Sequence, residues 1–236
     1  MTRERHVTAG RRPAAPNQAP KDAAAMRISS EDALVLVDIQ RDFCPGGALA
    51  VSDGDAVVPI ANRLMATGRF GVVVATQDWH PSGHISFASA HPGTAPFDSI
   101  DAPYGRQTLY PDHCVQETPG AELHPDLATA PIEMIVRKGY RQAVDSYSAF
   151  QENDRRTQTG LAGYLRERGV ARVVLAGLAA DVCVFFSAMD ARAAGFETVF
   201  VTDATRGVDR DGSVARSRAD MAAAGVLLLE SDALIG

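Results

Sequence analysis

The chain has 236 residues and a formal charge of −6 at pH 7, with 46% hydrophobic and 22% charged residues. This composition is typical of a folded globular protein, and a chain of this length can bury one sizeable core. Net negative charge argues against nucleic acid as a partner, and no apolar run approaches the roughly 20 residues that span a bilayer, which argues against a membrane.

The first 27 residues differ in composition from the remainder. They carry six Lys or Arg and two acidic residues, are rich in Ala and Pro, and show no apolar period. We therefore predict a disordered N-terminal extension over residues 1–30 and one folded domain over residues 31–236. The three cysteines are an odd number, which favours a reducing, cytoplasmic location over a disulfide framework.

From residue 33 onward, short apolar runs alternate with stretches of helical periodicity. Runs of Val, Leu and Ile without in-and-out alternation predict strands that are buried on both faces, as in a parallel sheet. The predicted strands span residues 33–38, 71–77, 132–138, 172–177, 198–203 and 225–230. The predicted helices span residues 55–68, 159–168, 181–194 and 213–224. This order of elements predicts a single α/β domain of three layers.

One connection is much longer than the others. Residues 78–131 separate the second and third strands and contain eight prolines and five of the six histidines. A connection this long inside a compact domain is usually functional or disordered, and its histidines and aromatic residues favour function.

Four reactive side chains lie at or just after the ends of the first four strands: Asp38, Asp78, Lys138 and Cys183. The carboxyl ends of parallel strands meet at one edge of the sheet, where ligands bind, so we expect these side chains to converge. Each also has a structural explanation, since Asp38 could serve loop amides, Lys138 could be solvated and Cys183 could fill the core. Cys183 is predicted to open a helix, however, where the dipole lowers a thiol pKa and favours the thiolate. Asp38 and Lys138 suit the base and the electrostatic partner that an activated thiol needs.

The long connection contains a second group of candidate residues. Asp78 and His80 are two residues apart and can reach one ion from an extended segment, and His113 could supply a third ligand. His84 could be a fourth ligand, or it could bond the substrate or a water. Two histidines and one aspartate would accept Zn, with Fe or Mn as alternatives.

Five segments together resemble the nicotinamidase branch of the isochorismatase-like cysteine hydrolases. They are LVDIQRDFCPGGALAV, TQDWHPSGHISFA, YPDHCVQETPGAELHP, VRKGYRQAVDSYSAF and GLAADVCVFFSAMDARAAGF, in the order of the family. The resemblance covers residues 33–230. It implies one α/β domain around a six-stranded, mainly parallel sheet, and hydrolysis of nicotinamide to nicotinate and ammonia in NAD salvage, often with activity on pyrazinamide.

The resemblance also implies a role for each motif residue. Cys183 would be the nucleophile, Asp38 its base and Lys138 the third member of the triad. The amides of Ala179 and Cys183 would form the oxyanion hole, with a cis peptide bond between Leu178 and Ala179. One divalent metal ion would be held by the ligands Asp78, His80 and His113, with His84 as a ligand only in some members.

Substrate contacts are expected from Phe43, Tyr110 and Leu178. Three positions depart from the family pattern. Tyr110 stands where the family usually has Trp, Ala180 replaces a Thr near the nucleophile, and Val182 replaces an aromatic residue or a histidine. These departures bear on substrate preference and rate, whereas the triad matches the family pattern.

Several alternatives stay open at this point. The enzyme could act on another small amide or an N-carbamoyl compound, although Asp78 and His80 argue against the branches that lack a metal. The chain could also be a catalytically silent binding module. Water activated at the metal could attack the amide directly, which replacing Cys183 with Ala would reveal. Family likeness alone suggests a homo-oligomer.

Overall fold

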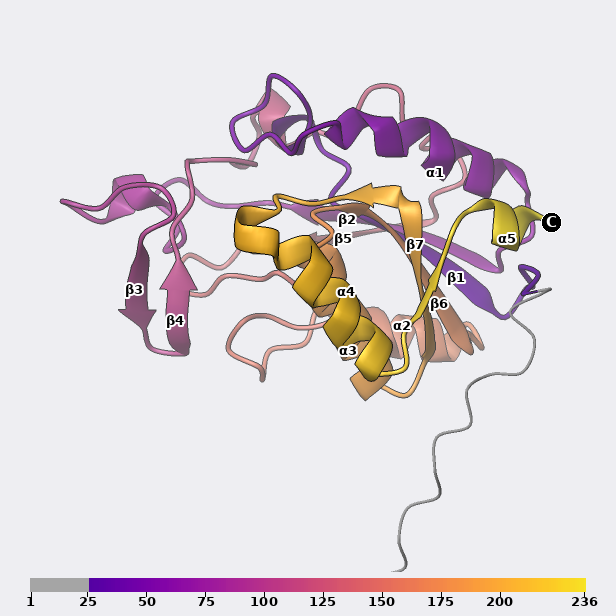
Figure 1. Ribbon diagram of the computed structural model, residues 1–236. Coiled ribbons are helices and arrows are strands. Elements are labelled where there is room, and N and C mark those ends of the chain that lie inside the picture. Colours follow the sequence, from indigo (N-terminus) through magenta and orange to yellow (C-terminus); the bar gives the residue numbers. More distant parts are fainter. Residues whose placement is uncertain (1–25) are drawn as a thin grey trace, which may run out of the picture.

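A six-stranded sheet runs through the centre of the structure, a computed structural model that describes residues 26–236 (Figure 1). In spatial order its strands are β5 (Met134–Lys138), β2 (Val72–Asp78), β1 (Asp32–Val37), β6 (Arg172–Leu178), β7 (Glu197–Arg206) and β8 (Leu227–Leu229). Every neighbouring pair in this sheet is parallel. The prediction of an α/β domain with six strands is confirmed, and the sheet is parallel throughout.

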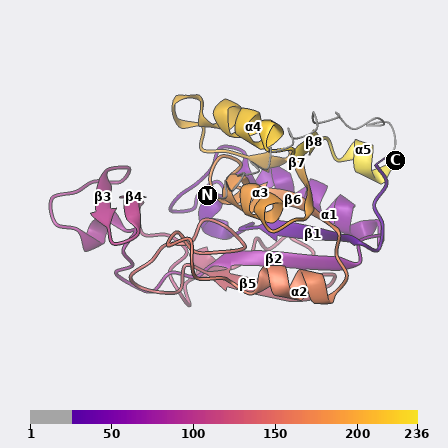
Figure 2. The ribbon, with the colours of Figure 1, turned by 90° about the horizontal axis from the view of Figure 1, so that it is seen from below.

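Helices cover both faces of the sheet, which gives the predicted three layers seen edge-on in Figure 1, and Figure 2 looks onto one of these faces. On one face lie α1 (Val57–Ala66) and the short α5 (Asp232–Ile235), and on the other lie α2 (Leu161–Glu167), α3 (Cys183–Ala193) and α4 (Ser213–Ala223). The four longer helices coincide with the predicted ones to within a few residues at each end, whereas α5 was not predicted.

The side chains of β1 explain why its sequence is apolar without alternation. Leu34 and Leu36 pack in the core on the α1 face, while Val35 and Val37 pack in the core on the opposite face. All four are fully buried, and each such side chain contributes roughly 1.5–3 kcal/mol relative to an exposed one. Burial on both faces is confirmed for the central strands but not for the edge strand β5, where Ile135 is 49% exposed.

The long connection between β2 and β5 contains an antiparallel hairpin that the sequence analysis did not predict. Its strands are β3 (Ser99–Ala102) and β4 (Gly105–Thr108), and it projects from one end of the sheet (Figure 1). These strands are short and largely exposed, so they lack the apolar runs by which the other strands were recognised. Gln107 on β4 is nevertheless only 1% exposed, which ties the hairpin to the domain.

The predicted extension over residues 1–30 falls mainly outside the described residues. Of the five that are described, Ile28 is buried in the core and Met26 packs against it, so the packed chain begins before residue 31. Among residues 26–236, no helix is both long enough and apolar enough to cross a membrane.

Candidate active site

Four side chains meet at the carboxyl edge of the sheet, as the strand order predicts. Asp78 and Lys138 end the neighbouring strands β2 and β5 and are register partners. Asp38 directly follows β1, and Cys183 is the first residue of α3, which follows β6. The carboxylates of Asp38 and Asp78 and the Cys183 sulfur lie within 4.8 Å of one another.

Lys138 lies at the centre of this group with its side chain fully buried. Its Nζ lies 2.8 Å from Asp38 Oδ2 and 2.5 Å from Asp78 Oδ1. It also donates to the Ser146 carbonyl at 2.9 Å and approaches the Cys183 sulfur at 3.6 Å. Burial opposes its charge, but the two carboxylates outweigh burial and raise the pKa of Lys138 well above its ordinary value. Lys138 is therefore a buried, fixed positive charge, and the alternative that it is an ordinary solvated lysine is excluded.

Asp38 is held in one orientation by Thr76. The Thr76 hydroxyl donates to Asp38 Oδ1 at 2.5 Å and accepts from the Asp38 amide at 3.0 Å. Asp38 Oδ2 lies at ion-pair distance from Lys138, but no group among residues 26–236 donates an aligned hydrogen bond to it. This oxygen is thus a buried acceptor with a free lone pair, and the Asp38 carboxylate lies within 4.8 Å of the Cys183 sulfur.

The predicted lowering of the Cys183 pKa by the helix terminus is not what the structure favours, although the predicted need for a base is unchanged. Cys183 does open α3, but it is only 6% exposed. Burial raises the pKa of its thiol well above the ordinary value, and the Asp38 and Asp78 carboxylates raise it further although Lys138 opposes them. The cost of burying a charge beside two carboxylates exceeds the benefit of the helix terminus. The resting side chain is a neutral thiol, so a base must remove its proton.

The backbone beside Cys183 offers two free amides. Among residues 26–236, the N–H groups of Ala179 and Cys183 donate to no other backbone or side-chain group. The Ala179 carbonyl is engaged instead, because it accepts from the amides of Val182 and Val184 at 3.1 Å each. The peptide bond between Leu178 and Ala179 is cis, as the resemblance implied.

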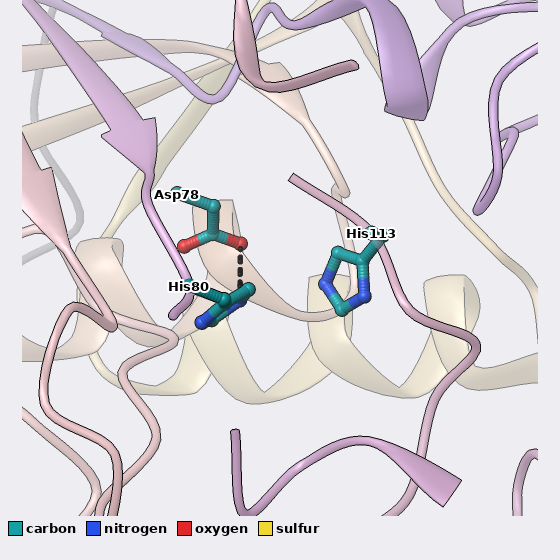
Figure 3. A group of neighbouring side chains, drawn as sticks. All are labelled: Asp78, His80 and His113. Atoms are coloured by element: carbon teal, nitrogen blue, oxygen red, sulfur yellow. Dashed lines mark ion pairs between the residues drawn. The ribbon is translucent and has the colours of Figure 1, made fainter. Parts of the chain in front are cut away.

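Asp78, His80 and His113 gather around a common point, with their donor atoms within 4.8 Å of one another (Figure 3). Asp78 and His80 come from the end of β2, and His113 comes from the far end of the long connection. Asp78 Oδ2 and His80 Nε2 are 3.6 Å apart. The structure therefore brings together the three residues that the sequence analysis predicted as ligands.

Both histidines are oriented by backbone carbonyls. His80 Nδ1 lies 2.9 Å from the Gly139 carbonyl, and His113 Nδ1 lies 2.7 Å from the Pro111 carbonyl. A protonated Nδ1 donates to each carbonyl and leaves the Nε2 lone pair free, which is how metal-binding histidines are usually held. Gly139 has a φ of +63°, and a Cβ there would lie 2.4 Å from the His80 ring, so this position requires glycine.

The ionisation of this group also suits a cation. Burial opposes the charge on Asp78, but Lys138 and His80 together lower its pKa below the usual range. Burial and His80 lower the pKa of His113 to about 4, so His113 is neutral near pH 7. Asp78 raises the pKa of His80 in spite of burial, which means that a positive charge is favoured between them.

His84 does not join this group. Its Nδ1 lies 2.8 Å from the Ser86 hydroxyl and its Nε2 lies 3.2 Å from the Val144 carbonyl, so both nitrogens are already engaged. Its ring stacks on His80 with centroids 4.3 Å apart. His84 instead forms a second buried group with His80 and Asp145, whose ligand atoms also lie within 4.8 Å of one another.

A small cavity, lined mainly by apolar and aromatic side chains, opens beside Cys183. Phe43, Tyr110 and Val182 line it, as do Tyr147 and Val208, which the sequence analysis did not single out. Leu178, from which a substrate contact is also predicted, does not line this cavity, and its side chain is fully buried in the core. Ala180 likewise packs in the core.

Two further residues missed by the sequence analysis hold the site in place. Gln40 is fully buried, and its amide accepts from the Asp78 backbone N–H at 2.8 Å and donates to the Asp78 carbonyl at 2.9 Å. The Asp42 carboxylate accepts from the amide of Cys114, next to His113, at 2.7 Å. Both lie in the segment LVDIQRDF, whose polar residues between apolar ones were the only available signal.

Known proteins share this arrangement of sequence and fold. The isochorismatase domain family matches residues 32–233. A nicotinamidase from Acinetobacter baylyi is 48% identical over 206 residues, which cover 87% of this chain and 95% of that relative. The structure of an Acinetobacter baumanii nicotinamidase and pyrazinamidase matches with a TM-score of 0.84 at 48% identity, over 86% of this chain and 97% of the other. A pyrazinamidase from Pyrococcus horikoshii, solved in complex with zinc, matches with a TM-score of 0.69 at 35% identity, over 85% and 99%.

A buried cysteine beside a lysine and a carboxylate, at the sheet edge of an α/β domain, is the arrangement of a cysteine hydrolase. The chain belongs to the isochorismatase family.

Proposed function

We propose that this chain is a nicotinamidase that also accepts pyrazinamide and releases ammonia from the carboxamide. The observation that carries the proposal is that Asp38, Lys138 and Cys183 converge beside a small aromatic cavity that also holds Asp78, His80 and His113. Similarity to the nicotinamidases named above supports the choice of substrate.

The proposed reaction begins with proton transfer from Cys183 to Asp38. Asp38 Oδ2 is the proposed acceptor, because its lone pair is free and the Asp38 carboxylate lies within 4.8 Å of the sulfur. The sulfur then attacks the carboxamide carbon, and Asp38 returns the proton to the departing ammonia. Water hydrolyses the resulting thioester, with Asp38 again acting as the base. Lys138 holds Asp38 in place and offsets the negative charge that builds up near the sulfur.

The oxygen of the carboxamide gains negative charge during attack, and the amides of Ala179 and Cys183 are its proposed partners. Both N–H groups are free to donate and both residues line the cavity. Donors of this kind are typically worth roughly 3–4 kcal/mol each in the transition state. Phe43 and Tyr110 would contact the flat faces and the edge of the ring.

We further propose that Asp78, His80 and His113 hold one divalent metal ion, with zinc first and iron or manganese as alternatives. The ionised carboxylate, the two free Nε2 positions and the carbonyls behind each ring fit such an ion. The zinc-bound pyrazinamidase from Pyrococcus horikoshii supports this choice. When bound, the metal would bind the ring nitrogen of the substrate and so direct its carboxamide toward Cys183.

Cellular context follows from the same proposal. The partner is a small-molecule amide, and the reaction would take place in the cytoplasm, where the three cysteines, all free and buried, would stay reduced. A homo-oligomer stays a prediction from family likeness.

The ionisation of Asp38 should set the acid limb of the activity. Burial raises the pKa of Asp38 to about 6, and Lys138 prevents a larger rise. A base with a raised pKa is protonated, and hence inactive, at higher pH than an ordinary aspartate. We expect kcat/KM for nicotinamide to fall about tenfold per pH unit below about pH 6. Initial rates from about pH 4.5 to about pH 8 in excess zinc measure this, and a flat profile through pH 6 would contradict the role of Asp38.

Removing the metal should remove activity. Dialysis against a chelator is expected to lower kcat/KM by at least about 100-fold, and added zinc, iron or manganese should restore it. His113→Ala should bind less metal and stay inactive at stoichiometric zinc, whereas His124→Ala, outside the ligand group, should behave like the wild type. Metal content and ammonia release are measured on the same samples. Full activity in a stripped sample free of metal would refute the metal site.

The function itself is tested by ammonia release from a panel of amides. Nicotinamide and pyrazinamide should be hydrolysed fastest, and a linear N-carbamoyl amine should not be a substrate. Hydrolysis of the carbamoyl compound alone would favour the alternative amidohydrolase. Binding without turnover of any amide by the metal-loaded protein would favour a silent binding module.

A further inference from the structure

Two tyrosine hydroxyls lie together on one wall of the cavity. Tyr110 and Tyr147 both line it, and their hydroxyl oxygens are 3.3 Å apart. Their rings meet edge to face with centroids 6.3 Å apart. Burial raises the pKa of both hydroxyls, so each keeps its proton at neutral pH. The two hydroxyls and Asp145 are polar groups in a lining whose other side chains are mostly apolar or aromatic.

The side chain of Gln107 lies next to the Tyr147 hydroxyl and acts toward it as a hydrogen-bond donor. Its Oε1 accepts from the Tyr104 hydroxyl at 2.9 Å and from the Asn153 amide at 3.4 Å. The opposite atom faces the Thr108 carbonyl and the Asp145 carboxylate, which can only accept, so it is the nitrogen. That Nε2 faces the Thr108 carbonyl at 2.7 Å, Asp145 Oδ2 at 2.8 Å and the Tyr147 oxygen at 3.0 Å. Gln107 only donates toward Tyr147, so it cannot take up the tyrosine proton.

Counting protons then shows an unused donor. The two hydroxyls carry two protons, and the single contact between their oxygens uses one of them. Among residues 26–236, neither hydroxyl donates a hydrogen bond to any other protein group, Asp145 included. One O–H therefore lacks a protein acceptor, and both residues that can carry it face the cavity. A buried donor without an acceptor is unfavourable, so an occupant that supplies an acceptor gains binding energy.

We propose that the Tyr110 and Tyr147 hydroxyls determine specificity by donating a hydrogen bond to a second acceptor on the substrate ring. The ligand class that this selects is a diazine carboxamide, in which one ring C–H of a pyridine carboxamide is replaced by nitrogen. The inference rests on the proposed carboxamide hydrolysis and concerns which ring is preferred. A pyridine ring presents only a C–H at this point and leaves the hydroxyl unpaired.

Three diazine carboxamides can show which ring position of the substrate faces the two hydroxyls. Pyrazine-2-, pyrimidine-5- and pyridazine-4-carboxamide all keep the ring nitrogen of nicotinamide meta to the carboxamide and add a second one ortho, meta or para. The experiment compares kcat/KM for each with that for nicotinamide, in the wild type and in the Tyr110→Phe, Tyr147→Phe double variant. Taking the ratio within each protein cancels intrinsic reactivity and any general loss of activity. The double variant is needed because either hydroxyl alone still carries a free proton.

We expect the ratio of at least one diazine to nicotinamide to fall by about fivefold or more in the double variant. The diazine affected shows which ring edge faces the hydroxyls. A change of less than about threefold for all three diazines would overturn the proposal. Tyr164→Phe, which removes a hydroxyl from the outer side of α2 that bonds Glu133, is the matched control and should leave every ratio unchanged.

Two further measurements keep the outcome clear. Thermal unfolding checks that the double variant, which loses two oxygen atoms and gains none, stays folded. Dissociation constants of the four amides in a Cys183→Ala background give the same ratios without turnover. If the wild type hydrolyses no nicotinamide, the proposed function fails, and these dissociation constants still decide whether the hydroxyls select the ring.

Discussion

Cys183→Ala should lower kcat for ammonia release from nicotinamide by at least about 10⁴-fold, the scale on which removal of a nucleophile acts. Alanine leaves the cavity and the ligand group of Asp78, His80 and His113 in place but removes the only atom that can form the thioester. Nicotinamide should still bind, so calorimetric titration is expected to give a dissociation constant close to the wild-type KM. Steady-state ammonia release measures the loss of turnover.

The matched control is Cys44→Ala. Cys44 is also a free, buried cysteine, 3% exposed against 6% for Cys183, but it does not line the cavity. Its removal should cost some stability and leave kcat unchanged. Substantial turnover by metal-loaded Cys183→Ala would show that water attacks the amide without a thioester, and the nucleophile would have to be reassigned.

The position of the catalytic group could be predicted from sequence because it depends on strand order alone. Asp38, Asp78 and Lys138 sit at the ends of apolar runs, and parallel pairing brings such ends together whatever the loops do. The three metal-ligand candidates were recognised from residue type and from a resemblance to a family. Their convergence depends on a connection of 54 residues whose path no local rule determines.

The residues that the sequence analysis missed act through such loop geometry. Gln40 and Asp42 bond backbone groups of segments distant in sequence, around Asp78 and Cys114. Tyr147 lies in the loop after β5, where its hydroxyl accepts from Gln107 on β4 and its amide donates to Asn153, so its place in the cavity depends on the hairpin and on this loop. Polar residues of this kind have no period, so the sequence shows that they stand in a motif but not which backbone groups they bond.

The predicted lowering of the Cys183 pKa was wrong for a different reason. A helix N-terminus lowers a thiol pKa when the sulfur is partly exposed, but the sequence does not report how deeply a residue is buried. In the structure, Cys183 is buried beside two carboxylates, and only Lys138 supplies a compensating charge. The same burial that suppresses the thiolate gives Asp38 its raised pKa of about 6, so the thiol and its base are adjusted by one environment.

Lys138→Met should be the most destabilising single change at the site. Methionine has a similar length but no charge, and it leaves Asp38 and Asp78 buried without the cation that lies 2.8 Å and 2.5 Å from them. Removing one partner from a buried ion pair typically costs about 3–5 kcal/mol, because the remaining charge is desolvated and unpaired. Urea denaturation of metal-free protein at about pH 7.5 measures the loss.

Arg172→Met is the matched control for this change. Arg172 also forms a largely buried ion pair, with Asp32 at 2.5 Å, but it lies at the start of β6, at the opposite end of the strand from Cys183. Its loss should lower stability without changing kcat/KM or its pH profile. Lys138→Met should change all three, which separates the electrostatic role of Lys138 from a general loss of stability.

The pH dependence of Lys138→Met has a sign that the electrostatics determine. In the wild type, Lys138 opposes the rise in the pKa of Asp38. Its removal should therefore raise that pKa above about 6 and move the acid limb of kcat/KM to higher pH. A carboxyl group whose folded pKa exceeds its unfolded value favours the folded state when protonated, so the variant should recover stability as the pH falls from about 7.5 to about 5. In the wild type, Asp38 keeps its lower pKa of about 6, and Asp78 titrates below this pH window. The wild type therefore gains less stability than the variant over the same pH range. An unchanged acid limb, or a stability deficit that does not shrink on acidification, would mean that Lys138 does not control the charge of Asp38.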